Sequence, residues 1–252
     1  WSSGNGTVWT METNDLGVSG LRYAAMAAHE GKLWLHGGVD SYGGVQYTVR
    51  SSSNGRIWTS AATANVRYMH SMLAFDNKLW TIAGRQRVIA GDIITNGVAS
   101  SVNGIDWTDE PVPGFAPRLN PGTAVHAGKM WAIGGALNNF NNPPYTNDVW
   151  SSPDGKTWTR VTASAPFCAR TVPVVVAAGN RLYVIGGYLE SGYGTNDVWK
   201  SHDGVTWEQV AVTTPFPLRS FFSGAAFDNG LYIIAGHVDG TVYQTNDIWF
   251  SK

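Results

Sequence analysis

Short apolar segments, separated by polar and glycine-rich turns, recur along the whole chain. The clearest are five runs that are apolar at nearly every position and end in Gly-Gly or Ala-Gly. Each has the length of a strand, and unbroken apolar character is typical of a strand whose sheet is covered on both faces. The five runs are Lys32–Gly38, Lys78–Gly84, Lys129–Gly135, Arg181–Gly187 and Gly230–Gly236.

Three further strand-length segments accompany each run in a fixed order. A segment rich in small and apolar residues precedes the run and opens with an arginine: Arg22, Arg67, Arg118, Arg170 or Arg219. A segment with the sequence Asn-Asp-(Val/Ile)-Trp, or a relic of it, follows the run. Its intact copies are Asn147–Trp150, Asn196–Trp199 and Asn246–Trp249. The fourth segment carries one of five regularly spaced tryptophans, Trp9, Trp58, Trp107, Trp158 and Trp207.

A turn signal joins the third segment to the fourth. The pattern Ser-x-(Asp/Asn)-Gly-x-x-Trp occurs five times, and its tryptophans are 49, 49, 51 and 49 residues apart. Asp-Gly and Asn-Gly tolerate the positive φ angles that a tight β-hairpin requires. Each repeat is therefore predicted to be a four-stranded antiparallel meander, and no segment has a helical period.

Four-stranded sheets that repeat along a chain are typical of a β-propeller. The arginine-led strand, the double glycine after an apolar strand and the spaced tryptophan resemble Kelch repeats, over essentially the whole chain. The resemblance implies an all-β fold, a β-propeller, and the five copies of the repeat predict five four-stranded blades. Kelch-type propellers serve as binding platforms and less often as enzymes, so it says little about function.

The ends of the chain predict how such a propeller would close. The chain starts inside a third strand, Trp1–Ser3, followed by a fourth, Thr7–Thr13, and it ends after a third strand. The N-terminal strand is therefore expected to complete the last blade, which leaves no open sheet edge. Since Trp249–Ser251 repeats what Trp1–Ser3 supplies, a fragment of a larger propeller stays open as an alternative.

Composition predicts a single domain over residues 1–252 and narrows the partners. The net charge is −1 and only 14% of the residues are charged, so no nucleic-acid partner is expected. No apolar run is long enough to insert into a membrane. Cys168 is the only cysteine and is expected to be a small buried residue. The chain does not begin with Met, which indicates a processed or excised piece. The texture, rich in Asn, Gly, Thr and Trp, favours an extracellular protein or one at a cell or virion surface.

The candidate site lies on the face that holds the long loops, because variable loops on a rigid scaffold are where binding usually resides. The strand-opening arginines would reach the same face and form a ring around the channel mouth, where their guanidiniums could bind carboxylate, sulfate or phosphate. The predicted ligand-binding residues are Arg22, Arg67, His70, Arg85, Arg87, Arg118, Arg170, Arg219, Tyr188 and His237.

A structural role competes with this reading, since each arginine could pair with the aspartate of its own third strand. Three repeats hold that aspartate, at Asp148, Asp197 and Asp247. The repeats that begin with Arg22 and Arg67 have Thr48 and Gly97 in its place. An unpaired buried arginine is costly, so these two are the arginines expected to bind a ligand.

Enzymatic activity is the less favoured reading, and no metal or other cofactor is predicted. The turn pattern also resembles the Asp-box of sialidases, but that box has one more residue between Asp and Gly and is structural. Candidate acids exist at Asp40, Glu190 and Asp239, without a marked nucleophile pair. A galactose-oxidase-like copper site is disfavoured, because the histidines have no ligand spacing. A lyase or glycosidase acting on polysaccharide at the arginine face remains the alternative, through Tyr68, His70 and His237.

The favoured reading is a non-enzymatic module that binds a protein or glycan partner. A building block of a larger surface assembly is the variant that would use the blade flanks instead.

Overall fold

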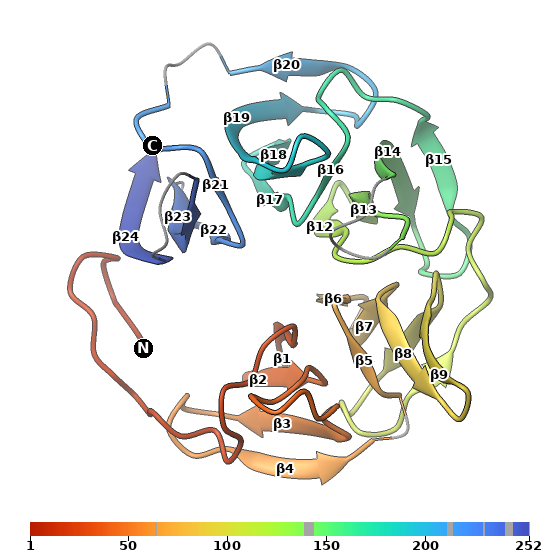
Figure 1. Cartoon of the computed structure of the whole chain (residues 1–252), viewed down its shortest axis with the longest axis vertical. Coiled ribbons are helices and arrows are strands. Elements are labelled where there is room, and N and C mark those ends of the chain that lie inside the picture. Colours follow the sequence, from red (N-terminus) through yellow and green to blue (C-terminus); the bar gives the residue numbers. More distant parts are fainter. Residues whose placement is uncertain (64, 139–143, 211–213, 229, 240–243, 252) are drawn as a thin grey trace. The chain divides into compact units, whose positions relative to one another are not determined.

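The computed structural model describes residues 1–251 apart from 64, 139–143, 211–213, 229 and 240–243. Every regular element among these residues is a β-strand, and the strands form antiparallel pairs (Figure 1). The chain divides into two compact units, Trp1–Val112 and Pro113–Lys252, which are described separately below. No helix in the described part could cross a membrane.

Unit 1 contains two four-stranded meanders, as the repeat pattern predicts. Sheet A has the order β1-β2-β3-β4, and sheet B has the order β6-β7-β10-β11. The strands of sheet A are β1 (Ala25–His29), β2 (Lys32–His36), β3 (Thr48–Ser52) and β4 (Thr59–Ala62). Those of sheet B are β6 (Ser71–Phe75), β7 (Lys78–Ile82), β10 (Val98–Ser101) and β11 (Thr108–Asp109).

Unit 2 contains three successive sheets of the same design. Sheet C consists of β12 (Gly122–His126), β13 (Lys129–Ala136), β14 (Tyr145–Ser152) and β15 (Thr159–Thr162). Sheet D consists of β17 (Val174–Ala178), β18 (Arg181–Leu189), β19 (Gly194–Ser201) and β20 (Trp207–Gln209). Sheet E has three strands, β22 (Ser223–Phe227), β23 (Gly230–Val238) and β24 (Gln244–Ser251). Two short strands, β16 (Arg170–Thr171) and β21 (Arg219–Ser220), bridge neighbouring sheets.

The expected completion of the last sheet is not confirmed. Within the described residues β24 pairs only with β23, while Thr10 of the N-terminal segment pairs with Ser2. Closure and the number of blades therefore stay predictions.

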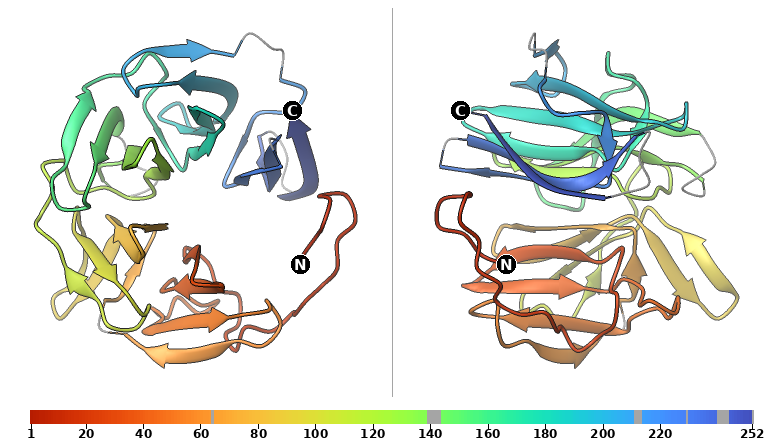
Figure 2. Two further views of the ribbon diagram at one scale, coloured as in Figure 1. Left: turned by 180° about the vertical axis from the view of Figure 1, so that it is seen from behind. Right: turned by 60° about the vertical axis from the view of Figure 1, so that its left-hand side comes forward.

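Two local expectations need correction. The loop after Gly84 forms a hairpin, β8 (Arg85–Val88) and β9 (Gly91–Ile94), which pairs with β5 (Arg67–Tyr68) and stands off from sheet B (Figure 2). Its isoleucines and valine favour strands, and Gly91 allows the turn. Cys168 is exposed rather than buried, because its neighbour Phe167 occupies the core.

The Ser-x-(Asp/Asn)-Gly-x-x-Trp pattern is a turn closed by its own side chains. In sheet D, Ser201 Oγ accepts the N–H of Gly204 at 2.9 Å, and Asp203 Oδ1 accepts two further backbone N–H groups at 2.9 Å. The indole of Trp207 donates to the Gly204 carbonyl at 3.0 Å, and Gly204 has φ of 74°. The same bonds recur in the other four copies, so the predicted hairpin turn is confirmed.

These turns also lock adjacent sheets together. A Cβ placed on Gly204 would lie 2.2 Å from Cζ3 of Trp131 in sheet C. In unit 1, a Cβ on Gly104 would meet Trp34 of sheet A at the same distance. Gly204 and Gly104 therefore lie flat against an indole of the preceding sheet. The core between sheets C and D continues this contact through Ile133, Phe167 and Trp207.

We expect Gly204→Ala to destabilise the protein more than Gly128→Ala does. Both glycines have positive φ, which costs alanine roughly 1 kcal/mol, but the Cβ at 128 would meet nothing within 4 Å. At 204 the clash with Trp131 should add roughly 1–3 kcal/mol. Calorimetric melting of both variants measures the difference, and equal losses would contradict the proposed sheet-to-sheet contact.

Candidate functional site

In unit 2, the strand-opening arginines are buried and paired with the predicted aspartates. The side chains of Arg118, Arg170 and Arg219 are at most 1% exposed. The Arg118 guanidinium donates to both carboxylate oxygens of Asp148, at 2.6 and 2.9 Å. The pairs Arg170–Asp197 and Arg219–Asp247 have the same bidentate geometry, with distances of 2.7 to 2.8 Å.

Each pair is part of a larger polar cluster. The tryptophan two residues after the aspartate donates its indole N–H to the same carboxylate, as Trp150 does to Asp148 at 2.7 Å. A phenylalanine three residues before the arginine lies under the guanidinium, as Phe115 does 5.0 Å below Arg118. Burial raises the pKa of the Asp148 carboxyl, but the hydrogen bond and charge of Arg118 outweigh it and hold that pKa below its usual value.

The register of sheet A shows that Arg22 is not the counterpart of these arginines. Arg22 pairs with Val39, a position that corresponds to the residue after the arginine in the other repeats. Leu21 takes the place of the buried arginine, since its Cδ1 approaches Gly38 as the Arg118 side chain approaches Gly135. Arg22 precedes the apolar run at Lys32 by 10 residues, whereas Leu21 precedes it by 11, the spacing of the arginine in the other repeats, so the alignment on Arg22 was wrong. Arg22 is exposed.

Arg67 is the true counterpart in sheet B, and it is buried without an aspartate of its own third strand. Its side chain is 2% exposed. Nε donates to Asn65 Oδ1 at 2.8 Å, and Nη1 donates to the carbonyls of Ala83 and Gly97 at 3.3 and 2.5 Å. The nearest carboxylate oxygen to Nη2 belongs to Asp109, 3.7 Å away on a side chain that is 83% exposed. Burial lowers the pKa of Arg67 to about 10, against a smaller opposing effect of Asp109.

Two buried histidines lie beside Arg67. His36 Nδ1 and His70 Nε2 are 3.1 Å apart, so one ring donates a hydrogen bond to the other. The Trp107 ring packs edge-on against His36, with centroids 5.0 Å apart. Burial, reinforced by the charge of Arg67, lowers the pKa of His36 to about 3. Burial also lowers the pKa of His70 well below its usual value, with further effects of His36 and Arg67. Both histidines are therefore neutral near pH 7.

The β8–β9 hairpin brings two more predicted residues into this region of unit 1. Arg85 lies over the ring of Tyr68, with its guanidinium carbon 5.9 Å from the centroid. Asp92 accepts a hydrogen bond from the Tyr68 hydroxyl at 2.7 Å and pairs with Arg87 at the same distance. The structure thus gathers Arg67, Tyr68, Arg85 and Arg87 on one small sheet, β5-β8-β9, with His70 two residues after it.

The remaining predicted residues lie in unit 2. Tyr188 packs against Tyr145 and Phe221, with ring centroids 6.5 and 6.2 Å away. His237 is half-buried and pairs with Gln244 in sheet E.

The candidate acids bond to main-chain N–H groups. Glu190 accepts the backbone N–H of Tyr145 at 2.7 Å. Asp239 accepts that of Gly194 at 2.5 Å, and Asp40 accepts two within its own loop. These three carboxylates therefore tie loops and neighbouring sheets together. The described residues contain no group of three or more His, Cys, Asp and Glu side chains that could hold a metal ion.

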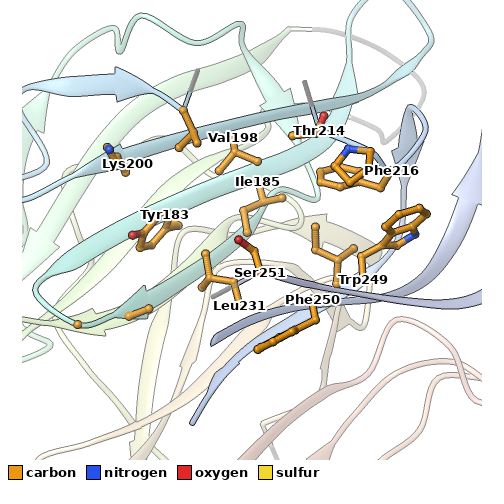
Figure 3. A pocket seen from close by; sticks show the side chains of 15 residues that line it. Tyr183, Ile185, Val198, Lys200, Thr214, Phe216, Leu231, Trp249, Phe250 and Ser251 are labelled. Atoms are coloured by element: carbon orange, nitrogen blue, oxygen red, sulfur yellow. The ribbon is translucent and has the colours of Figure 1, made fainter. Parts of the chain in front are cut away.

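Unit 2 also has an apolar groove of about 540 Å³ between sheets D and E (Figure 3). It is lined mainly by Tyr183, Ile185, Phe216, Leu231 and Trp249. The matching space between sheets C and D contains an additional indole, that of Trp207. In the described part of the chain, no residue takes the place of Trp207 beside Trp249.

Some features of the site were outside the reach of sequence reasoning. His36 stands where the other repeats have isoleucine. An alignment of the repeats shows this difference, but it does not show that His36 contacts His70. Asn65 and Asp109 lie outside the repeated positions. The sequence comparison recognised that Gly97 replaces the aspartate of the third strand. It did not recognise that Ala99, two residues later, replaces the tryptophan.

Comparisons with known proteins agree with the repeated-sheet architecture. A family model described as the DUF6242 beta propeller domain matches residues 1–251. The chain is also similar to Beta-scruin of Limulus polyphemus, with 26% identity over 181 residues, or 66% of this chain. The match spans only 19% of the length of Beta-scruin.

We expect the protein to lose stability as the pH falls from about 6.5, before the carboxylates titrate. His36 and His70 are neutral in the fold, but in the unfolded chain they take up protons near pH 6.5. Stability is therefore complete above pH 6.5 and falls toward pH 3, by up to about 1.4 kcal/mol per pH unit for each histidine.

Urea unfolding between pH 7.5 and 5.0 measures this slope. The matched variant is His36→Ile, because isoleucine occupies the same register position in sheets C and D. The variant should show a shallower dependence on pH. An unchanged slope would show that the histidine pair is not its source.

Proposed function

Because this chain belongs to the DUF6242 β-propeller domain family, we propose that it is a Kelch-type binding module that recognises a protein partner. The proposed contact surface is the β5-β8-β9 sheet of unit 1 with the adjoining Arg67. Single-domain organisation, an extracellular location, glycan binding and a role in a surface assembly stay predictions. So do the contributions of Arg22, Arg118, Arg170, Arg219, Tyr188 and His237 to binding.

The observation that carries this proposal is the exposed apolar tip of the hairpin beside a buried, incompletely paired arginine. Ile89 at the β8–β9 turn is fully exposed, and Ile93 on β9 is 48% exposed. Arg87 on β8 is 41% exposed. Arginine and large apolar side chains that project together are enriched in protein–protein contacts. β9 is also the edge strand of its sheet, so its main chain is available for pairing with an extended peptide.

An enzyme acting on polysaccharide receives less support from this geometry. Tyr68 is engaged by Asp92, and His70 is buried against His36. The candidate acids Glu190 and Asp239 bond to backbone N–H groups in unit 2.

Selection of a random peptide library against the wild-type protein tests the proposed surface. We expect enriched peptides to combine acidic and apolar residues, and the double variant Arg87→Ala/Ile89→Ser to bind them at least about tenfold more weakly. Ile57→Ser is the matched control, since Ile57 is 73% exposed on the turn after β3. Peptides that bind the double variant as tightly as the wild type would place the binding surface elsewhere.

We also propose that the repeats form five blades and that the N-terminal strand completes the last one. Three features support this arrangement. Sheet E has one strand fewer than sheets C and D. The groove has no counterpart of the Trp207 indole beside Trp249, and the segment Ser3–Trp9 carries a complete turn with its own tryptophan. By analogy with Lys200 and Glu208 of sheet D, Phe250 would then replace Ser2 as the partner of Thr10.

A cysteine pair tests this register. In a Cys168→Ser background, Phe250→Cys with Thr10→Cys should form an intramolecular disulfide, seen as a faster band on a non-reducing gel. Phe250→Cys with Thr59→Cys is the control, because Thr59 is the same turn position in sheet A. A disulfide confined to dimers, or none, would contradict closure within one chain.

A further inference from the structure

Sheet B keeps the buried arginine of the repeat but lacks its carboxylate. Gly97 stands where sheets C, D and E have aspartate, and Ala99 stands where they have the tryptophan that bonds to that aspartate. Sheet A differs in another way. There Leu21 replaces the arginine and Thr48 replaces the aspartate, so that both charges are lost together. Among the described sheets, only sheet B keeps the arginine of the repeat without its aspartate. The buried Arg50 of sheet A stands instead at the tryptophan position of β3 and donates to Gln46 Oε1 at 3.3 Å.

We propose that Arg67 binds a carboxylate supplied by the partner, namely the side chain of an aspartate or glutamate. This inference rests on the proposed function and names the group that the partner presents. The incoming carboxylate would take the role that Asp148 has toward Arg118.

The hydrogen bonds of Arg67 leave one edge of the guanidinium for this carboxylate. Nε is occupied by Asn65, and Nη1 by the carbonyls of Ala83 and Gly97. For Nη2, the nearest carboxylate oxygen among the described residues is Asp109 Oδ1 at 3.7 Å, beyond hydrogen-bond distance. In sheets C, D and E, the same Nη2 donates to an aspartate at 2.7 to 2.9 Å.

The surroundings of Arg67 favour an anion over a neutral ligand. The Asn65 amide, 7% exposed, accepts from Arg67 through Oδ1 and has an unpaired Nδ2. The charge of Arg67 helps to lower the pKa of His36 and of His70, and these neutral histidines contribute no compensating negative charge. A buried guanidinium that lacks a close counter-charge gains most from a charge-assisted hydrogen bond. A carboxylate suits the few available donors better than a phosphate, which has more acceptor oxygens to satisfy.

The Arg67 side chain is 2% exposed, but the residues beside its free edge are exposed or half-buried. Asp109, whose carboxylate is closest to Nη2, is 83% exposed, and residues 95–97 are half-buried. The same edge lies beside the chain that continues from β9, so a peptide held by the hairpin could place an acidic side chain there.

Acetate tests the subsite without any knowledge of the partner. We would measure melting temperatures at pH 7 in sodium acetate and in sodium chloride of equal ionic strength. The wild type should show a saturable acetate-specific rise, about 3 °C at tenfold excess over Kd.

Gly97→Asp should abolish this rise, because the new carboxylate would pair with Arg67 in place of acetate. A Cβ at this position lies 3.1 Å from Nη2, so the guanidinium must shift by a few tenths of an ångström, and circular dichroism would verify the fold. Asp148→Gly, which removes the carboxylate from Arg118, should gain a second acetate response. No acetate-specific rise in the wild type, or the same rise in Gly97→Asp, would overturn the proposal.

Three ligands then identify the source of the carboxylate. A blocked tripeptide with a central glutamate should reproduce the acetate effect, whereas its glutamine counterpart should not. Galacturonate acting in place of the glutamate peptide would overturn the assignment to a protein side chain. Unchanged peptide binding in Arg87→Ala/Ile89→Ser, together with an intact acetate response, would contradict only the proposed hairpin surface, so the two proposals fail separately.

Discussion

The buried pairing of an arginine with an aspartate is the constraint on which the repeated sheet depends. In sheets C, D and E, this pair ties the start of the repeat to its third strand, 27 to 30 residues later. The arginine also bonds to the carbonyl of the first residue of the glycine pair, as Arg118 does to Gly134 at 3.0 Å. Removing one member of a buried pair costs about 3–5 kcal/mol, because the other charge then stays buried alone. The pair thus fixes where the double glycine, the aspartate and the indole must stand.

The two sheets of unit 1 show two different ways of departing from this constraint. Sheet A exchanges the whole pair for Leu21 and Thr48, although it buries another cation, Arg50, on β3. Sheet B keeps Arg67, which is held by carbonyl groups and by Asn65. The first change removes both charges of the pair, whereas the second removes only the anion and retains the electrostatic cost of the buried arginine. A binding site is expected where one repeat departs from the shared pattern and this departure costs stability.

Most of the scaffold could be predicted from the sequence, because the same segments recur in the same order in each repeat. Five copies of one turn, five apolar strands and three intact Asn-Asp-(Val/Ile)-Trp segments agree on strand order and on the hairpin turns. The Arg–Asp pairs in sheets C, D and E followed from the same comparison. Prediction failed where a repeat departs from the shared pattern. Leu21 holds the arginine position at the regular distance from Lys32, and Arg22 follows it by chance, while the β8–β9 hairpin occupies a segment without a counterpart in the other repeats.

Side-chain contacts between neighbouring sheets were a second limit. His36 and His70 are 34 residues apart, and nothing local indicates that their rings meet. Cys168 follows a buried phenylalanine, and which of the two side chains enters the core depends on the path of the irregular segment before β16. Pattern reasoning could therefore locate the region of Arg67 but not its bonding.

The turn motif has a consequence for the order in which the chain folds. The hydrogen bonds that recur in every copy join residues at most three positions apart, from Ser201 to Gly204 and from Gly204 to Trp207. Loops this short close within tens of nanoseconds, and hairpins form within microseconds. The Arg–Asp pairs, by contrast, require closure of a loop nearly ten times longer. Each hairpin is thus expected to assemble first and to present its tryptophan as a nucleus, onto which the preceding sheet condenses.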